Sequence, residues 1–301
     1  MPLPDGFNDV AACFSDLMQA VRGDSGTHHT DGEQRLLIDQ LRNALDRRAE
    51  TLAPSDPTFI AGTFAVETLL YEGRYSRVLK LQHRDLGTAY VLKTLTTDGA
   101  SSASQAELLI REARIGLNLD HPSLVGTSML LRLADGSPGI IQPWAGYSLR
   151  ERLEKDDETE LDVAQILHDL LTALEALHNR GLVHGDVTPS NIILDPQRRI
   201  ARLADFGLTI ECGASWADLG LAEAGSPDYC APEQSASSNA SAAMDLYSAG
   251  RVLLRMLGTA PQGQNFDLAQ LAEHLCSVDP ANRPRTVKQA LEKLSQIRAK
   301  A

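Results

Sequence analysis

The sequence contains few cysteines, few basic residues relative to its acidic ones, and no long apolar run. Four cysteines are scattered over 301 residues without a CxxC pair, which argues against a disulfide framework or a zinc site. No stretch approaches the ~18 consecutive apolar residues of a membrane span, and the N-terminus lacks the layout of a signal peptide. We therefore expect a cytoplasmic protein with free thiols.

The charge balance bears on the partners of the protein. Acidic residues outnumber basic residues, 40 to 28, which gives a net charge of -12. The general basic surface that nucleic-acid binding requires is missing, so no nucleic-acid partner is expected. Hydrophobic residues make up 43% and charged residues 23%, as in globular proteins, which excludes a disordered chain, a collagen-like repeat and a coiled-coil rod.

The apolar pattern changes near residue 57. Residues 1–57 hold two stretches with apolar residues three and four apart, typical of helices, and the prolines of APSDP at 53–57 end the second. Short β-rich segments follow from 64 to 94, then a helical pattern at about 104–119, and mainly helical patterns after 160. We predict a helical N-terminal extension over 1–57 and an α+β domain over 58–301.

Two later segments carry the residue types of phosphoryl-transfer chemistry. The segment LVHGDVTPSNIILD at 182–195 places Asp186 five residues before Asn191, and ADFGL follows at 204–208. Asp186 can lie beside an attacking hydroxyl, while Asn191 and Asp205 offer the hard oxygen ligands of Mg²⁺. Upstream, Lys93 ends a predicted strand and Glu112 lies in the predicted helix, a pair that can fix a cation against nucleotide phosphates.

These residues, in this order, resemble the protein-kinase family over about 60–301. Further matches are His121-Pro122, HGD at 184–186 for HRD, DFG at 205–207, GSPDYCAPE at 225–233, DLYSAG at 245–250 and Arg283-Pro284. The resemblance implies a bilobal fold with a small β-rich N-terminal lobe and a helical C-terminal lobe. The sequence is similar to bacterial serine/threonine kinases. Ser226 stands at a position that is typical of serine/threonine specificity.

The resemblance also implies a set of ligands and roles. The substrates would be ATP and proteins, with Mg²⁺ or alternatively Mn²⁺ as the cofactor. Asp186 would be the catalytic base, Lys93 would contact the phosphates under the control of Glu112, and the metal ligands would be Asn191 and Asp205. The nucleotide-binding residues would be Gly73, Val78, Lys93, Pro143, Ala145, Asn191 and Asp205. In the linker, the Pro143 carbonyl and the Ala145 N–H would bind adenine, with Gln142 behind them.

Several positions depart from the family pattern. Tyr71 and Ser76 replace two glycines of the Gly-rich loop, so we expect a stiffer loop. Gly116, one turn after Glu112, predicts an under-packed and mobile helix because glycine disfavours helix. Thr188 stands where a lysine is usual.

The residue that usually contacts the activation segment, the stretch that GSPDYCAPE at 225–233 closes in the family, also differs. Gly185 replaces the arginine of HRD, which often pairs with a phosphate in this family. We therefore predict that phosphorylation of Thr209 or Ser215 is not required for activity. A literal HRD at residues 83–85 has Tyr90 where a metal ligand would be needed, so we predict a solvated turn there.

Three interpretations stand beside one another. The first is an active serine/threonine protein kinase. The second is a pseudokinase that binds a nucleotide or a partner, favoured by the altered Gly-rich loop, Gly185 and Thr188. The third is a small-molecule kinase of the aminoglycoside type, which would lack the APE-like and DxWSxG-like elements. For residues 1–57 we expect dimerisation or partner binding, either docked near the helix of Glu112 or as a tether.

Overall fold

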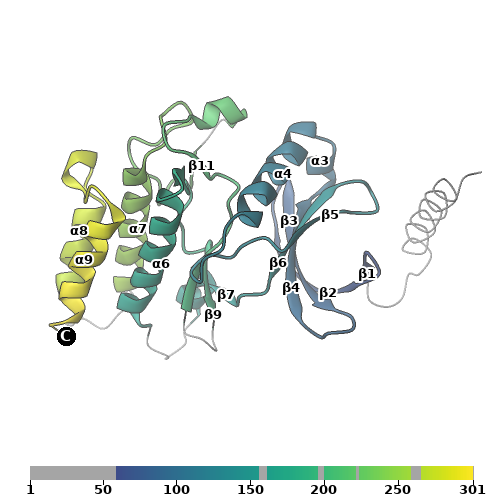
Figure 1. Ribbon diagram of the computed structural model, residues 1–301, viewed down its shortest axis with the longest axis horizontal. Helices are drawn as coiled ribbons and strands as arrows, with labels where there is room; N and C mark the ends of the chain where they lie inside the picture. Colours follow the sequence, from purple (N-terminus) through teal and green to yellow (C-terminus); the bar gives the residue numbers. More distant parts are fainter. Residues whose placement is uncertain (1–58, 156–160, 196–199, 222–223, 259–265, 301) are drawn as a thin grey trace, which may run out of the picture. The chain divides into compact units, whose positions relative to one another are not determined.

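The computed structural model describes residues 59–155, 161–195, 200–221, 224–258 and 266–300 (Figure 1). The chain divides into two units after Val66. In the first unit, β1 (Phe59–Ile60) pairs antiparallel with the start of β2 (Phe64–Glu72). The second unit begins at Glu67, and the candidate site lies within it. The two helices predicted within 1–57 lie outside the described residues.

A sheet with the strand order β1-β2-β3-β4-β6-β5 forms the β-rich part. Its further strands are β3 (Ser76–His83), β4 (Ala89–Leu95), β5 (Met129–Arg132) and β6 (Pro138–Pro143). They follow the predicted segments, because Val, Leu, Thr and Tyr suit a pleated and half-buried surface. The antiparallel register places Lys93 opposite Val78 on one side and opposite Ile140 on the other.

One long helix, α4 (Ala103–Leu117), packs on this sheet after the single turn α3 (Thr97–Ala100). Leu109 and Ala113 form an apolar cluster with Ile140 of β6, as residues one turn apart share a helix face. Glu112 lies on the same side of α4, and its packing leaves the residue only 3% exposed. The sheet and α4 therefore bring Glu112 toward the strand that carries Lys93.

The prediction that Gly116 leaves α4 under-packed is wrong. A Cβ atom at Gly116 would clash with the side chain of Thr127. The Thr127 N–H also donates to the Gly116 carbonyl at 3.1 Å. Glycine at this position therefore lets the following segment lie directly against the helix backbone, so the site is close-packed.

The helical part is built around α6 (Val163–His178), with α7 (Ala242–Leu257), α8 (Phe266–Leu275) and α9 (Val287–Arg298) contributing to one core (Figure 1). The helical pattern predicted after residue 160 is confirmed here, and α6 buries an apolar stripe made of Ile166, Leu167, Leu170, Leu171, Leu174 and Leu177. The α+β class is confirmed.

The remaining elements are short and connect the larger ones. They are α5 (Leu149–Glu154), β7 (Tyr147–Ser148), β8 (Leu182–Val183), β9 (Ile192–Asp195), β10 (Ile200–Leu203), β11 (Ile210–Glu211) and the 3₁₀ turns η1 (Trp216–Leu219) and η2 (Pro280–Asn282). The small sheets have the orders β10-β9-β7 and β11-β8. The β8 and β9 strands bracket the loop that carries Asp186 and Asn191.

Candidate active site

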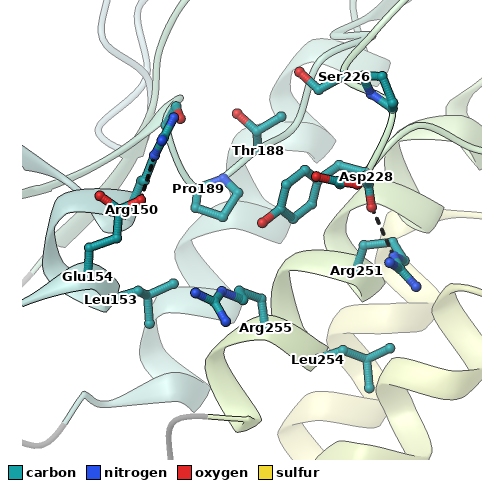
Figure 2. A pocket seen from close by; sticks show the side chains of 13 residues that line it. Arg150, Leu153, Glu154, Thr188, Pro189, Ser226, Asp228, Arg251, Leu254 and Arg255 are labelled. Carbon is teal, nitrogen blue, oxygen red and sulfur yellow. Dashed lines mark hydrogen bonds and ion pairs between the residues drawn. The ribbon is translucent and has the colours of Figure 1, made fainter.

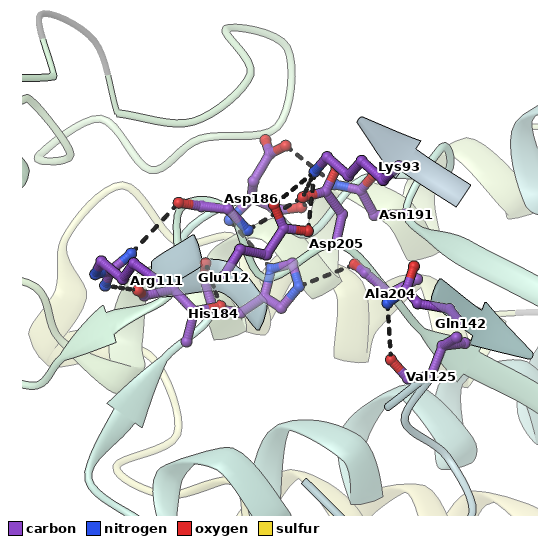
Figure 3. Close-up of polar contacts among 12 residues, drawn as sticks. Lys93, Arg111, Glu112, Val125, Gln142, His184, Asp186, Asn191, Ala204 and Asp205 are labelled. Atoms are coloured by element: carbon purple, nitrogen blue, oxygen red, sulfur yellow. Dashed lines mark hydrogen bonds and ion pairs between the residues drawn. The ribbon is translucent and has the colours of Figure 1, made fainter. Parts of the chain in front are cut away.

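Three charged side chains from three separate elements meet at one point. Lys93 Nζ of β4 lies 2.9 Å from Glu112 Oε2 of α4 and 2.7 Å from Asp205 Oδ1, which follows β10. Figure 3 shows the three side chains pointing toward one another. The side chains of Lys93 and Glu112 are 14% and 4% exposed, whereas that of Asp205 is 42% exposed. The Asp205 end of this triad is therefore the end that a solvent-borne ligand can reach.

Burial and the attraction between opposite charges shift the pKa values of the triad in opposite directions. Burial alone would lower the pKa of Lys93, but attraction to Asp205 and Glu112 outweighs it and raises this pKa. Burial raises the pKa of Glu112 to about 7, although Lys93 opposes the shift. Burial would likewise raise the pKa of Asp205, yet Lys93 holds it below its usual value. The site thus holds a fixed cation, an ionised carboxylate and a carboxyl group that titrates near neutral pH.

The loop between β8 and β9 places Asp186 and Asn191 side by side. Asn191 Nδ2 donates to the Asp186 carbonyl at 2.8 Å and to Asp186 Oδ2 at 3.0 Å. Asp186 Oδ1 accepts from the Ser226 N–H at 3.0 Å and from the Ser226 hydroxyl at 2.8 Å. One oxygen of Asp186 is therefore oriented by an amide, and the other already accepts a hydrogen bond from a hydroxyl group.

Asp245 of α7 holds the backbone of this loop. Its Oδ2 accepts from the His184 N–H at 2.9 Å and lies 2.8 Å from His178 Nε2, while Oδ1 accepts from the Gly185 N–H at 2.9 Å. Burial would raise the pKa of Asp245, but the hydrogen bond and charge of His178 and further bonds lower it. An ionised and buried carboxylate thus anchors the residues directly before Asp186.

Gly185 fits against the activation segment, where the family pattern would place an arginine. Its φ is +80°, and a Cβ atom would lie 2.9 Å from Trp216 Cζ2 and 3.0 Å from the Leu208 carbonyl oxygen. Trp216 is completely buried, and its Nε1 donates to that same carbonyl at 2.8 Å. Both the backbone conformation and the indole ring therefore require glycine at this position.

Side chains on two sides hold the segment that follows Asp205. Arg111 of α4 donates to the carbonyls of Gly207, at 3.5 Å, and Thr209. Phe206 is fully buried, and Asp205 adopts a left-handed conformation with a φ of +66°. These contacts turn the Asp205 carboxylate toward Lys93.

The turn between β2 and β3 is covered and tethered. A Cβ atom at Gly73 would lie 2.6 Å from the Tyr71 hydroxyl, so this ring folds over the glycine. The Thr96 hydroxyl donates to the Arg74 carbonyl at 2.6 Å, and the Thr96 N–H donates to the Tyr75 carbonyl at 3.0 Å. The predicted stiffness of this turn stays a prediction, and these contacts are its physical basis.

The linker is the short stretch at 143–145, where β6 ends, and exposed and buried residues stand close together in it. Gln142 is buried and donates to the Val125 carbonyl at 3.4 Å (Figure 3). Pro143 is exposed and Ala145 is buried. The Ala145 N–H donates to no other described residue.

Other sequence expectations find direct counterparts. Arg283 and Glu233 belong to two of the motifs that resemble the family, and Arg283 Nη1 and Nη2 lie 2.6 and 2.9 Å from the two carboxylate oxygens of Glu233. At the literal HRD, the N–H groups of Asp85 and Leu86 donate to His83 Nδ1 at 3.2 and 3.3 Å. This tripeptide forms the turn after β3, as predicted, and has no part in the site.

The oxygen donors near Asp205 fit Mg²⁺. Asp205 Oδ2 and Asn191 Oδ1 accept no hydrogen bond from the described residues, and both are hard oxygen donors. In the described ranges, no group of three or more His, Cys, Asp or Glu side chains could hold a metal ion alone. Two protein oxygens suit Mg²⁺, which usually keeps several waters and binds substrate phosphates.

Comparisons with known proteins place the chain in a family. The protein kinase domain model matches residues 64–295, so the chain belongs to the protein kinase family. The chain is 28% identical over 232 residues to "serine/threonine-protein kinase pkn3" of Myxococcus xanthus, covering 73% of this chain and 42% of that protein. It is 31% identical over 245 residues to "DNA damage-responsive serine/threonine-protein kinase RqkA" of Deinococcus radiodurans, covering 78% and 35%. The chain thus spans less than half the length of these relatives.

A solved structure supports the fold. The PknI kinase domain of Mycobacterium tuberculosis matches with a TM-score of 0.62 and 22% identity, covering 82% of this chain and 100% of that one. This likeness confirms the bilobal kinase fold. In the part of the chain that the structure describes, no helix has the length and apolar content to cross a membrane.

Three contacts of the site were not predicted from the sequence. These are the Ser226 bonds to Asp186, the Arg111 bonds to the segment after Asp205, and the packing of Trp216 on Gly185. Ser226 and Gly185 lie inside motifs that resemble the family, and this position is a signal that each has a partner in the site. No local pattern marks Arg111 or Trp216, because each acts on residues distant in the sequence.

Proposed function

We propose that this chain is a serine/threonine protein kinase that transfers the γ-phosphoryl group of ATP to protein hydroxyls, with Mg²⁺ or Mn²⁺ as cofactor. The observation that carries the proposal is Lys93 held between Glu112 and Asp205, at 2.9 and 2.7 Å, in a chain whose Asp186 accepts a hydroxyl hydrogen bond. Membership of the protein kinase family and the names of the serine/threonine kinase relatives support the same activity.

Each proposed role follows from a position in the site. Asp186 orients the acceptor hydroxyl and takes its proton, a role that the Ser226 contact supports. Lys93 binds the α- and β-phosphates, and Glu112 limits the positions that its ammonium group can take. Asp205 and Asn191 hold the metal ion, whose chemistry is to neutralise phosphate charge.

The nucleotide would lie along the sheet and the linker. Val78 is paired directly with Lys93 across β3 and β4, so its side chain belongs to the same end of the sheet. Gly73 allows the backbone to approach the phosphates. The Pro143 carbonyl would accept from the adenine amino group, and the Ala145 N–H would donate to a ring nitrogen.

The test is transfer of labelled phosphate from ATP, in Mg²⁺ and separately in Mn²⁺, to generic protein substrates. Asp186→Ala should lower kcat at least a hundredfold, because removal of a positioned base costs about 10²–10⁴-fold. Lys93→Met and Asp205→Ala should abolish transfer. Asp85→Ala is the matched control, since this exposed aspartate ends the literal HRD and should leave the rate unchanged. Wild-type turnover in Asp205→Ala would refute the site.

A nucleotide-binding module without transfer is the second candidate. Tyr71 folded over Gly73 and the buried Thr188 are the observations that favour it. Such a protein would show an ATP-dependent rise in melting temperature by mass action, while labelled phosphate stays on the nucleotide. The two measurements on one preparation separate the candidates.

We also propose that residues 58–301 form the kinase domain, that 1–57 form a separate helical extension, and that the protein works in the cytoplasm. The family match that starts at residue 64 supports the boundary, and the free thiols of the described cysteines, Cys212, Cys230 and Cys276, suit a reducing compartment. Deleting 1–57 tests the extension. A soluble, monomeric product with unchanged turnover would favour a tether, whereas altered turnover or oligomeric state would favour docking or dimerisation.

A further inference from the structure

A cavity of about 670 Å³ opens beside Asp186. Its walls are α5, the loop at 188–190, the end of the activation segment at 226–229 and the C-terminal half of α7 (Figure 2). Ser226 lines the cavity and also donates two hydrogen bonds to Asp186. A peptide whose hydroxyl reaches Asp186 would therefore place its neighbouring side chains in this cavity.

Three arginines line the cavity together with two carboxylates, those of Glu154 and Asp228, which leaves one positive charge in excess. Arg150 Nε lies 2.8 Å from Glu154 Oε1, so its charge is paired. Arg251 Nε donates to the Asp228 backbone carbonyl at 3.1 Å, a neutral acceptor. Arg255 also lines the cavity, and it forms none of the ion pairs found among the described residues. The cavity thus offers unpaired guanidinium donors.

The two unpaired guanidinium groups belong to one helix face. Arg251 and Arg255 are four residues apart in α7 and face the same cavity (Figure 2). Like charges at this spacing repel each other on a helix. An anion bound between them relieves that repulsion and gains charge-assisted hydrogen bonds.

Leu153 and Leu254 line the cavity beside Arg251 and Arg255, which are exposed and therefore open to an anion from solution. Tyr229 lines the same cavity, and burial raises the pKa of its phenol although Arg255 lowers it. It adds a hydroxyl donor to the cavity.

We propose that this cavity selects substrates with an anionic side chain, a carboxylate or a phosphate, a few residues from the acceptor hydroxyl, and that Arg255 is the residue that contacts it. The proposal rests on the kinase activity proposed above and adds its substrate class. The net charge of -12 repels acidic peptides at long range. Selection must therefore come from short-range contact in the cavity.

The test uses the full chain and peptides with one central serine. At each position from three before to three after that serine, the peptides carry Glu, Gln, Lys or phosphoserine in turn, and kcat/KM is measured. We expect Glu to exceed Gln by about tenfold at one or two positions, with Lys below Gln. The Glu and phosphoserine arms tell which anion fits better.

The variants assign the effect to Arg255. Arg255→Ala should reduce the Glu-to-Gln ratio to near one, mainly through KM, and Arg255→Glu should favour Lys over Glu. Arg285→Glu is the matched control, because it makes the same change in net charge at an exposed arginine outside this cavity, and the ratio should persist.

The outcomes separate this proposal from the proposed function. Absence of transfer to every peptide and protein refutes the kinase activity itself. Transfer with equal kcat/KM for Glu, Gln and Lys peptides refutes only the selection. An unchanged ratio in Arg255→Ala also refutes it, as does an equal loss of the ratio in Arg285→Glu.

Discussion

Adding a single methyl group at Gly185 tests the link between the catalytic loop and the activation segment. In Gly185→Ala the new Cβ atom would lie 2.9 Å from Trp216 Cζ2 and 3.0 Å from the Leu208 carbonyl oxygen. The residue also has a φ of +80°, which L-residues other than glycine rarely adopt. The substitution therefore combines backbone strain with over-packing.

The two costs can be estimated separately. A left-handed conformation costs a non-glycine residue roughly 1–2 kcal/mol. An extra carbon in a close-packed interior costs about 1–3 kcal/mol. The expected loss in the free energy of unfolding is thus about 2–5 kcal/mol, a large part of the 5–15 kcal/mol typical of native proteins.

Gly213→Ala separates the strain from the over-packing. Gly213 also has a left-handed φ, +88°, lies in the same activation segment, and would have nothing within 4 Å of its Cβ. We expect this control to show the strain alone. The difference between the two variants in urea unfolding should then be about 1–3 kcal/mol.

Fluorescence reports whether Trp216 moves to relieve the clash. The sequence has two tryptophans, so Trp144→Phe leaves Trp216 as the only one. In that background Gly185→Ala should shift the indole emission to the red as the buried ring meets water. Equal stability of the two alanine variants, together with unchanged emission, would refute the packing argument.

Three further predictions concern other parts of the site. Alanine at both Thr209 and Ser215 should leave turnover within a few-fold, and a hundredfold loss would contradict this; the complete burial of Thr209 supports the expectation. Glu233→Ala leaves buried Arg283 without its carboxylate partner and should lower the free energy of unfolding in urea by about 3–5 kcal/mol. Loss of an exposed ion pair would lower it by less than about 1 kcal/mol. Burial raises the pKa of Glu112 from 4.5 to about 7. The favourable contribution of protonated Glu112 to the free energy of unfolding is therefore complete below pH 4.5 and is lost as the pH rises to about 7. The unfolding free energy of wild type relative to Glu112→Gln should fall over that range, and a flat difference would contradict the raised pKa.

The sequence predicts the contact between Asp186 and Asn191 because the two residues are five positions apart in one loop. Asp186 and Asn191 share one loop, and their side chains meet wherever that loop folds as in the family. Lys93 and Glu112 lie on two separate elements, and the resemblance to the family, not the apolar patterns, pairs them; in the structure they are 2.9 Å apart. The buried stripe of α6 is predictable because apolar residues recur there at helical spacing.

Close packing between distant segments could not be predicted in this way. Gly116 suggests a weak helix if only helix propensity is considered, yet the helix approaches Thr127 so closely that a larger residue would not fit. Gly185 suggests a missing charge, but its partner Trp216 lies 31 residues further along the chain. In both cases the glycine has to be interpreted from the side chain that fills the space beside it.

The α7 helix connects the chemistry of the site to its proposed choice of substrate. Asp245, near its start, anchors the backbone before Asp186, and Arg255, ten residues later, lines the cavity. A helix rises 1.5 Å per residue, so about 15 Å of rigid helix separates the two. The distance between Asp186 and Arg255 is then nearly constant, so the proposed contact requires the anionic residue at a fixed spacing from the acceptor. A preference spread evenly over all peptide positions would instead indicate general electrostatic attraction, and Arg255 would not be its cause.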